Sequence, residues 1–213
     1  MEKYHKYVFD QKAKAFVGDF EKMYQDEDKD CFDSWHQEDS RQLNRNIALS
    51  ILKGWNFNSV LDVGCGKGAL THLLKKNNNR VLGIDISETA IEKAKARYPD
   101  IEFEKVDIGD SRALVATLMA AKGASHDNYV DLVFTAETLS YIESWEDVVQ
   151  TIAQHSKYFL ISLFIPHDPI GFVRNADQLE AVVGKSFEII ENVSMKKSRF
   201  VVIFAKSKLS VED

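Results

Sequence analysis

The fold class is indicated most clearly by residues 59–70, which read Ser59-Val60-Leu61-Asp62-Val63-Gly64-Cys65-Gly66-Lys67-Gly68-Ala69-Leu70. The first five of these residues are mostly apolar and β-branched, which is typical of a buried parallel strand. The three glycines then supply positions without a Cβ, where the backbone can take unusual dihedral angles and approach a ligand closely. We expect a helix over residues 69–76, whose N-terminus would point at this turn and favour an anionic group there.

Strand-like and helix-like runs alternate along the rest of the chain. The expected strands are residues 59–63, 80–85, 101–106, 131–136 and 158–165. The expected helices are residues 39–53, 69–76, 87–98, 111–122 and 145–155, and Asp39 or Ser40 could cap the first of them. This alternation predicts an α/β fold, a doubly wound and mostly parallel sheet with right-handed crossovers. A helix over 175–183 and strand-like runs over 187–193 and 199–206 predict a closing antiparallel hairpin.

The N-terminal 39 residues differ in composition from the rest of the chain. Phe9, Phe16 and Phe20 stand at helical spacing and predict one amphipathic helix within residues 1–25, which either packs on the domain edge or caps a pocket. Residues 19–39 hold nine acidic and two basic side chains, a pattern typical of a solvated loop. Residues 32–36 are too aromatic for a linker and are a candidate binding lip. We therefore predict one domain over 1–213, with a helical cap (1–39) on a core (40–213).

Composition narrows the possible classes of protein. A net charge of −6 argues against a protein that coats nucleic acid. Two cysteines are too few for a disulfide framework, so a cytoplasmic location is expected. The longest apolar run, residues 158–166, is too short to cross a bilayer, and the N-terminus lacks the apolar segment of a signal peptide. No group of His, Cys, Asp and Glu has metal-ligand spacing, so no metal is expected.

Acidic residues follow the predicted strands at the edge where doubly wound sheets bind ligands. Asp85 ends the second strand and could accept hydrogen bonds from both hydroxyls of a ribose, whereas Asp107 ends the third and could bind an adenine amino group. The Gly-x-Gly-x-Gly spacing departs from the dinucleotide fingerprint. Asp62, two residues before the first glycine, disfavours a pyrophosphate and suits a positively charged amino-acid group. The pattern predicts an adenosine ligand that carries positive charge.

Four motifs in order resemble those of class I S-adenosylmethionine-dependent methyltransferases. They are Val60-Leu61-Asp62-Val63-Gly64-Cys65-Gly66-Lys67-Gly68, Gly83-Ile84-Asp85-Ile86-Ser87, Asp107-Ile108 and Asp131-Leu132-Val133-Phe134. The resemblance covers about residues 40–165 and implies a seven-stranded, Rossmann-like sheet closed by the C-terminal hairpin. His155-Ser156-Lys157 replaces the Gly-Gly turn that the family often has before strand five.

The resemblance also implies a cofactor, S-adenosylmethionine, and its product S-adenosylhomocysteine. Its methionine part and ribose would be surrounded by Asp62, Gly64, Cys65, Gly66 and Gly68, and Asp85 would hold the ribose hydroxyls. Ile86 would lie against adenine, whose edge and face Asp107 and Ile108 would recognise. Thr135 and Ala136 would line the path to the methyl group. Cys65 also invites a nucleophile interpretation, but a small buried residue fits the turn equally well and no base stands near it in the sequence.

The implied reaction is methyl transfer by in-line displacement to a nitrogen or oxygen of a small molecule. Residues 1–39, 137–146 and 166–175 would hold this acceptor, and they are not notably basic. Glu137 is one polar group near the strand ends, and His36, Tyr141 and His167 are the candidates for a catalytic role, either as orienting groups or as a base. The expected partners exclude nucleic acid and membrane, and the chain is expected to be a monomer or homodimer. Two alternatives stay open: a catalytically silent cofactor-binding protein and an NAD-dependent oxidoreductase.

Overall fold

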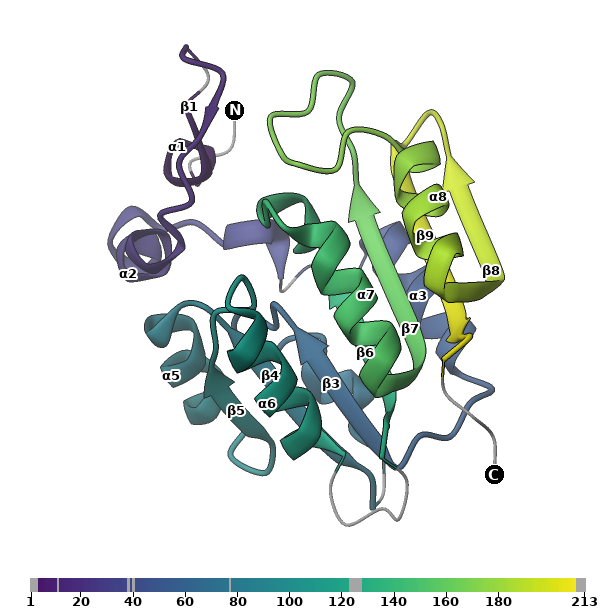
Figure 1. Ribbon diagram of the computed structural model, residues 1–213. Helices are drawn as coiled ribbons and strands as arrows, with labels where there is room; N and C mark the ends of the chain where they lie inside the picture. The colour runs from purple at the N-terminus through teal and green to yellow at the C-terminus, as the bar shows by residue number, and fades with distance from the viewer. Residues whose placement is uncertain are drawn as a thin grey trace.

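A seven-stranded sheet forms the centre of the protein (Figure 1). The computed structural model describes residues 4–10, 12–37, 39, 41–76, 78–122 and 128–209. The strand order is β5-β4-β3-β6-β7-β9-β8, in which β5 to β7 are parallel and β9 runs antiparallel to both β7 and β8. The strands are β3 (Ser59–Val63), β4 (Arg80–Asp85), β5 (Glu102–Lys105), β6 (Val130–Ala136), β7 (Ser156–Phe164), β8 (Phe187–Met195) and β9 (Phe200–Ser207). The predicted fold class, including the closing hairpin, is confirmed.

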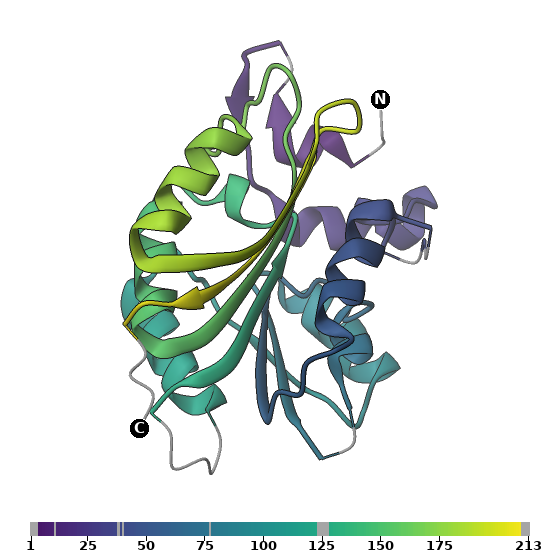
Figure 2. The same cartoon turned by 90° about the vertical axis from the view of Figure 1, so that its right-hand side faces the viewer.

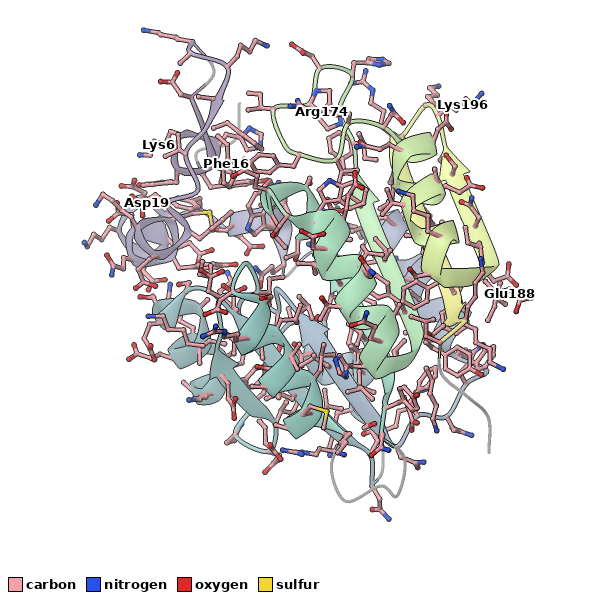
Figure 3. All side chains as sticks on the ribbon, in the orientation of Figure 1. Lys6, Phe16, Asp19, Arg174, Glu188 and Lys196 are labelled. Atoms are coloured by element: carbon pink, nitrogen blue, oxygen red, sulfur yellow. The ribbon has the colours of Figure 1, made fainter. Side chains whose placement is uncertain are left out.

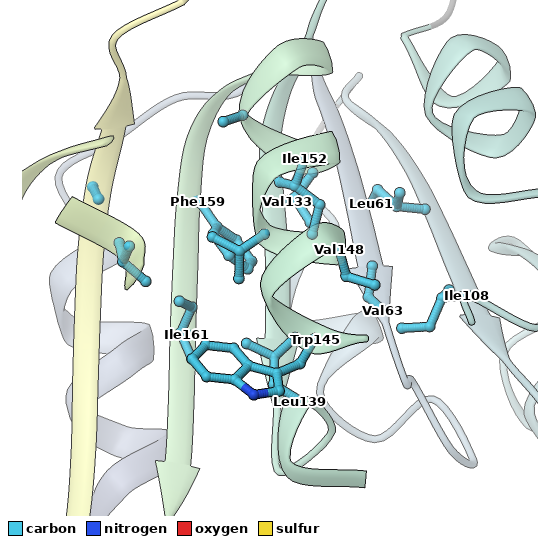
Figure 4. Packing of buried hydrophobic residues seen from close by; sticks show 14 of the residues in the cluster. Leu61, Val63, Ile108, Val133, Leu139, Trp145, Val148, Ile152, Phe159 and Ile161 are labelled. Atoms are coloured by element: carbon cyan, nitrogen blue, oxygen red, sulfur yellow. The ribbon is translucent and has the colours of Figure 1, made fainter. Parts of the chain in front are cut away.

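Helices cover both faces of this sheet (Figure 2). They are α3 (Leu43–Leu52), α4 (Thr71–Leu74), α5 (Glu88–Arg97), α6 (Ser111–Ala121), α7 (Trp145–His155) and α8 (Ala176–Ser186). Successive strand residues point to opposite faces. Val133 and Phe159 therefore pack with Trp145 and Ile152 under α7, as Figure 4 shows, whereas the next residue along β6, Phe134, belongs to the cluster under α3. The inner parallel strands β3, β4, β6 and β7 are largely apolar because both faces are buried, whereas the edge strand β5 buries only Phe103.

Side-chain caps explain why several helices begin where the sequence predicts. The Ser87 hydroxyl accepts from the Ala90 N–H at the start of α5, and the Asp110 carboxylate accepts from the backbone at the start of α6. Asn175 caps α8 in the same way by accepting from the Gln178 N–H. Each cap satisfies backbone donors that the first helical turn leaves unpaired.

Two predicted helices are shorter than expected. The helix over 69–76 is only the four residues Thr71–Leu74, because the Asn79 side chain binds the Leu74 carbonyl and the Lys76 N–H and ends it there. Such a short helix has little dipole, so the expected anion site at its start is not supported. The helix over 39–53 begins at Leu43 without a side-chain cap, since the Asp39 carboxylate accepts from Arg41 instead. Ser40, the other expected cap, lies outside the described residues.

The N-terminal segment is not one amphipathic helix. It comprises α1 (His5–Val8), a hairpin of β1 (Phe9–Asp10) and β2 (Ala15–Phe16), α2 (Phe20–Asp30) and the 3-10 turn η1 (Ser34–His36). Phe9 pairs with Phe16 across the hairpin, so their spacing of seven reflects strand register rather than a helical face. The acidic run over 19–39 predicts a solvated loop, but its centre, residues 26–30, lies in α2, where Glu27 is only 3% exposed.

This N-terminal segment lies over the carboxyl ends of the strands (Figure 1). Its aromatic side chains form a cluster of their own, together with Tyr141 from the turn after β6. Phe16, labelled in Figure 3, stacks edge-on with Phe172 from the loop after β7, at 5.6 Å between ring centroids. The Lys14 ammonium also bonds the Asp168 carboxylate of that loop at 2.6 Å. No helix among the described residues is both long and apolar enough to cross a membrane.

Candidate active site

A cleft of about 580 Å³ lies between the N-terminal segment and the strand ends. Phe20, Tyr24 and Trp35 line it from the N-terminal side. The wall opposite them consists of residues that follow β3, β4, β5 and β6: Gly64, Asp85, Ile86, Asp107, Ile108, Gly109, Ala136, Glu137 and Thr138, with Tyr141 to Ser144 beyond. The cleft therefore occupies the position at which doubly wound sheets bind ligands.

Two of the predicted carboxylates stand on the cleft wall. Asp85 accepts the Gly66 N–H at 2.9 Å through Oδ2 and the Ser87 N–H at 3.0 Å through Oδ1. Burial raises the pKa of Asp85 despite these hydrogen bonds. Asp107 Oδ1 accepts the Gly109 N–H at 2.9 Å. Beside them Ile86 is 45% exposed, an unusual state for isoleucine that presents an apolar face to the cleft.

The first glycine of the turn brings the backbone close to the loop after β6. Gly64 has φ +76°, and a Cβ there would lie 2.0 Å from Thr138 Oγ1. Gly66 has φ +54°, and its Cβ would meet the Gln37 side chain at 2.3 Å. Gly66 and Gly68 do not line the cleft, so in this structure they serve the close packing of the turn. Thr135 is also absent from the lining, because it is buried and its hydroxyl donates to the Val63 carbonyl.

We expect Gly64→Ala to destabilise the fold and move Thr138. A non-glycine residue in the left-handed region costs about 1–2 kcal/mol, and the contact with Thr138 adds to this loss. Gly184→Ala is the matched control, since it lies inside α8 with nothing within 4 Å and should stabilise by about 0.5–1 kcal/mol. Urea unfolding of both variants checks the difference. Equal stability of Gly64→Ala and the unmodified protein would contradict it.

Charge in the cleft has one sign. Asp85, Asp107, Glu137 and Glu143 line it, and no Lys or Arg stands among the described residues of its wall. A pyrophosphate would meet only carboxylates, with no cation to pair with it. A ligand that carries positive charge would be attracted.

A small cavity of about 30 Å³ adjoins the cleft, and Asp62, Glu137 and Arg45 are the charged residues on its wall. Asp62 is 2% exposed, and burial raises its pKa to about 7 although the Thr71 hydroxyl donates to it at 2.6 Å. The guanidinium of Arg45 donates to the His36 and Trp35 carbonyls, each at 2.7 Å. Its Nε is buried and has no hydrogen-bond partner among the described residues. Because buried donors normally have a hydrogen-bond partner, this Nε–H indicates that a ligand provides the acceptor.

Cys65 lines the same small cavity. Burial raises the pKa of its thiol well above the usual value, so the thiol stays protonated. A protonated, buried thiol is a poor nucleophile. The structure therefore favours the structural interpretation of Cys65.

The N-terminal segment is fastened to the glycine turn by polar contacts. The Lys67 ammonium bonds Glu27 at 3.0 Å and Asp33 at 2.8 Å. The Gln37 side chain accepts the Lys67 N–H at 2.8 Å and donates to the Tyr24 hydroxyl at 2.9 Å. The cleft is consequently closed on one side by residues 4–37, as a cap would close it.

A second cavity of about 570 Å³ lies on the other side of Trp35 and Tyr141. These two rings stand 5.2 Å apart and, with Glu137, line both cavities. His36 also lines the second cavity. His167 is exposed and lines neither cavity, so it plays no part in the mechanism proposed below.

Glu137 is held in an unusual backbone conformation at the junction of the cavities. Its φ is +58°, and its N–H donates to the Ser162 carbonyl at 2.9 Å. Its carboxylate accepts the Asn44 amide at 2.8 Å and the Phe164 N–H at 2.9 Å. Burial raises the pKa of Glu137 to about 7, against the lowering effect of these donors and of Arg45. Strain of this sort in a non-glycine residue is concentrated at functional sites.

Sequence reasoning missed Arg45 and Asn44. Both lie on α3 and are buried there, at 6% and 8% exposure, on the same side of the helix as the buried Ala48 and Leu52. The available signal was a charged residue next to an amide on the apolar side of a helix, since such residues are rarely buried without a partner. Within the described ranges, no three His, Cys, Asp or Glu side chains gather as a metal site requires.

The strand order, with an antiparallel β9 inserted between β7 and β8, defines a Rossmann-like methyltransferase fold. Residues 61–157 match the model of a family described as "Methyltransferase domain". This match covers a little under half of the chain, and solved structures of S-adenosylmethionine-dependent methyltransferases share the fold.

The alignments with individual curated relatives cover only part of each chain. The ubiquinone biosynthesis O-methyltransferase of Nitrosomonas europaea is 29% identical over 112 residues, 53% of this chain and 45% of that protein. The trans-aconitate 2-methyltransferase of Acidovorax sp. is 34% identical over 68 residues, 31% and 26% of the two chains. The magnesium protoporphyrin IX methyltransferase of Synechocystis, solved with bound S-adenosylmethionine, superposes with a TM-score of 0.59 at 18% identity over 81% and 80%. The chain spans less than half of the length of the curated relatives.

Proposed function

We propose that the protein binds S-adenosylmethionine in the cleft and transfers its methyl group to a nitrogen or oxygen of a small molecule. The observation that carries this proposal is the charge of the cleft: four carboxylates and, within the described wall, no Lys or Arg, at the strand ends of a methyltransferase domain. A sulfonium with an ammonium suits such a wall better than a dinucleotide does. Residues 1–39 would serve as the cap and 40–213 as the core of a single domain.

The residues present fit this cofactor. Asp85 would accept both ribose hydroxyls, Ile86 and Ile108 would flank the adenine, and Asp107 would take its amino proton. Asp62 would bind the ammonium group of the methionine part. The unsatisfied Nε of Arg45 would then donate to its carboxylate.

The cofactor supplies a methyl group already activated by the sulfonium, so the protein's contribution is orientation of the acceptor. Trp35 and Tyr141 stand between the cleft and the second cavity and would fix the direction of approach. Orientation and exclusion of water together are worth up to ~7–11 kcal/mol of the barrier in favourable cases. Tyr141 would act by position, since burial raises the pKa of its phenol and keeps it protonated.

The remaining assignments follow the same proposal. The acceptor is a small molecule held in the second cavity, and the protein works as a monomer or homodimer without nucleic acid or membrane. An exposed Cys31 and a buried Cys65, both free thiols, suit the reducing cytoplasm.

Thermal-shift titrations with S-adenosylhomocysteine and with NAD test the proposal. We expect S-adenosylhomocysteine at 100 times its Kd to add about 2.7 kcal/mol of stability and NAD to add none. Stabilisation by NAD alone would favour an oxidoreductase instead. Labelled S-adenosylmethionine with a panel of amines, acids and hydroxyl compounds then separates an enzyme from a silent binder, for which no acceptor would be labelled despite tight cofactor binding.

A further inference from the structure

We propose that the second cavity is the acceptor site for a primary amine on a flat apolar body, and that the Glu137 carboxylate takes a proton from its nitrogen. This inference rests on the proposed function, because it names the substrate class of the same site. It assigns Glu137 a catalytic role and gives the cavity a preference against carboxylate acceptors.

Charge is the first argument for a cationic acceptor. The carboxylates on the cavity wall are Glu137 and Asp168, and no Lys or Arg lines it within the described part of the chain. Lys14 pairs with Asp168 at the exposed rim, which leaves Glu137 as the inner charge. An acceptor carboxylate would be desolvated beside Glu137 with no Lys or Arg on the described cavity wall to pair with it, which costs free energy. An ammonium group would gain a charged hydrogen bond at the same place.

Aromatic rings are the second argument. Tyr4, Phe9, Trp35 and Tyr141 surround the cavity, with ring centroids 4.8 Å apart for Tyr4 and Trp35 and 5.8 Å apart for Phe9 and Tyr141. Flat apolar groups pack well against such rings, and an ammonium is attracted to their faces. The cavity thus offers both a stacking surface and a cation site.

The position of Glu137 is the third argument. Trp35 and Glu137 line the cleft, the small Asp62 cavity and the second cavity alike. The place where all three meet is where a methyl donor in the cleft would face an acceptor in the second cavity. Of the two residues, Glu137 has the proton acceptor. Its Oε2 accepts only the Phe164 N–H among the described donors, so a lone pair is left for the acceptor.

The proton balance is complete without another reactant. The amine arrives as an ammonium, and Glu137 takes one proton to become a carboxylic acid while the nitrogen gains its lone pair. The nitrogen then forms the bond to the methyl carbon as the carbon–sulfur bond breaks, which leaves a methylated ammonium and a thioether. Glu137 returns its proton to water. The pKa of about 7 given to Glu137 by burial matches this exchange near neutral pH.

Binding is tested first, on the unmodified protein. S-adenosylhomocysteine binding is measured by calorimetry, and its failure would overturn the proposed function itself. Phenethylamine, 2-phenylethanol and 3-phenylpropionate are then titrated into the protein saturated with S-adenosylhomocysteine. We expect the amine to bind at least tenfold more tightly than the carboxylate. An amine that binds no better than the carboxylate overturns the amine-site proposal alone, and tighter binding of the alcohol indicates a hydroxyl acceptor instead.

Glu137→Gln tests the proton acceptor. With an amine that the unmodified protein methylates, we expect kcat/KM to fall by about 10²–10⁴-fold while the Kd for S-adenosylhomocysteine stays within about threefold. For the unmodified protein kcat/KM should rise with pH through about 7, as Glu137 loses its proton, and this rise should be absent in Glu137→Gln. Glu146→Gln, an exposed carboxylate on α7, is the control and should behave as the unmodified protein.

Other groups near Glu137 must be separated from it in the pH profile. The titratable groups that share a cavity with Glu137 are Tyr4, His5, His36, Tyr141 and Asp168 in the second cavity, Tyr24, Asp85, Asp107 and Glu143 in the cleft, and Arg45, Asp62 and Cys65 in the small cavity. Burial raises the pKa of Asp62 to about 7 as well, but a rise in kcat/KM that comes from Asp62 would persist in Glu137→Gln. Histidines also titrate near neutral pH, so His36→Gln is the second variant. We expect its pH-dependent rise to persist. A rise that survives in Glu137→Gln and vanishes in His36→Gln overturns the assignment to Glu137.

Discussion

Glu27→Gln is expected to loosen the N-terminal segment from the core. Glu27 is 3% exposed and its carboxylate bonds both Lys67 and Lys93, at 3.0 and 3.2 Å. Removing one member of a buried ion pair leaves its partners uncompensated, which costs about 3–5 kcal/mol. Lys67 keeps Asp33 and Lys93 keeps Asp28, so we expect roughly 3 kcal/mol, the lower end of that range.

Besides lowering the free energy of unfolding, Glu27→Gln should make the N-terminal segment open more often by itself. The Glu27 network is one of several polar contacts that hold residues 12–37 to the core, together with those of Glu21 to Ser87 and Thr89. Limited proteolysis should therefore cut this segment faster in Glu27→Gln. Asp28→Asn is the matched control, because Asp28 is the next residue of α2, also bonds Lys93, and is 82% exposed. Exposed pairs of this kind contribute little. Equal unfolding free energies for the two variants, measured in urea, would contradict a buried fastening at Glu27.

Where sequence and structure agree, the information was local. The strand before the glycine turn, Asp85 and Asp107 at or just after strand ends, and the helix starts near Ser87 and Asn175 each depend on neighbouring residues. Burial on both faces makes the inner parallel strands largely apolar runs, which are easy to recognise. The core fold was therefore predictable.

The errors lie where contacts are distant in sequence. The spacing of Phe9 and Phe16 fits a helix, but the two residues pair across a hairpin. So few residues do not distinguish the period of a helix from that of a strand. The acidic run in α2 was interpreted as solvated because Lys67 and Lys93, its partners, are about 40 and 66 residues away. Likewise the Glu137 carboxylate is held by the amide of Asn44, 93 residues earlier, and no local pattern reveals this contact.

Asp85→Ala is expected to weaken S-adenosylhomocysteine binding at least tenfold. The carboxylate stands on the cleft wall and is held there by two backbone N–H groups, so no rotation is needed for it to accept ribose hydroxyls. Hydrogen bonds to a charged group contribute about 1.5–3 kcal/mol, which is roughly a 10- to 150-fold change in Kd. Calorimetric titration of the variant measures this change.

The same carboxylate also holds the glycine turn, so a loss of affinity has two possible sources that must be separated. Asp85→Ala leaves the Gly66 and Ser87 N–H groups without their acceptor, whereas Asp85→Asn keeps one oxygen for them. Because the two N–H groups bind different oxygens, Asp85→Asn keeps an acceptor for only one of them. If the ribose contact dominates, both variants lose similar affinity, although Asp85→Ala loses more stability than Asp85→Asn without ligand. Asp131→Asn is the control: it removes a buried carboxylate from the opposite end of the sheet, where it bonds the Asn58 N–H and Lys157, and should lower stability without changing the Kd. Unchanged binding by Asp85→Ala would refute the ribose assignment and, with it, the orientation of the cofactor in the cleft.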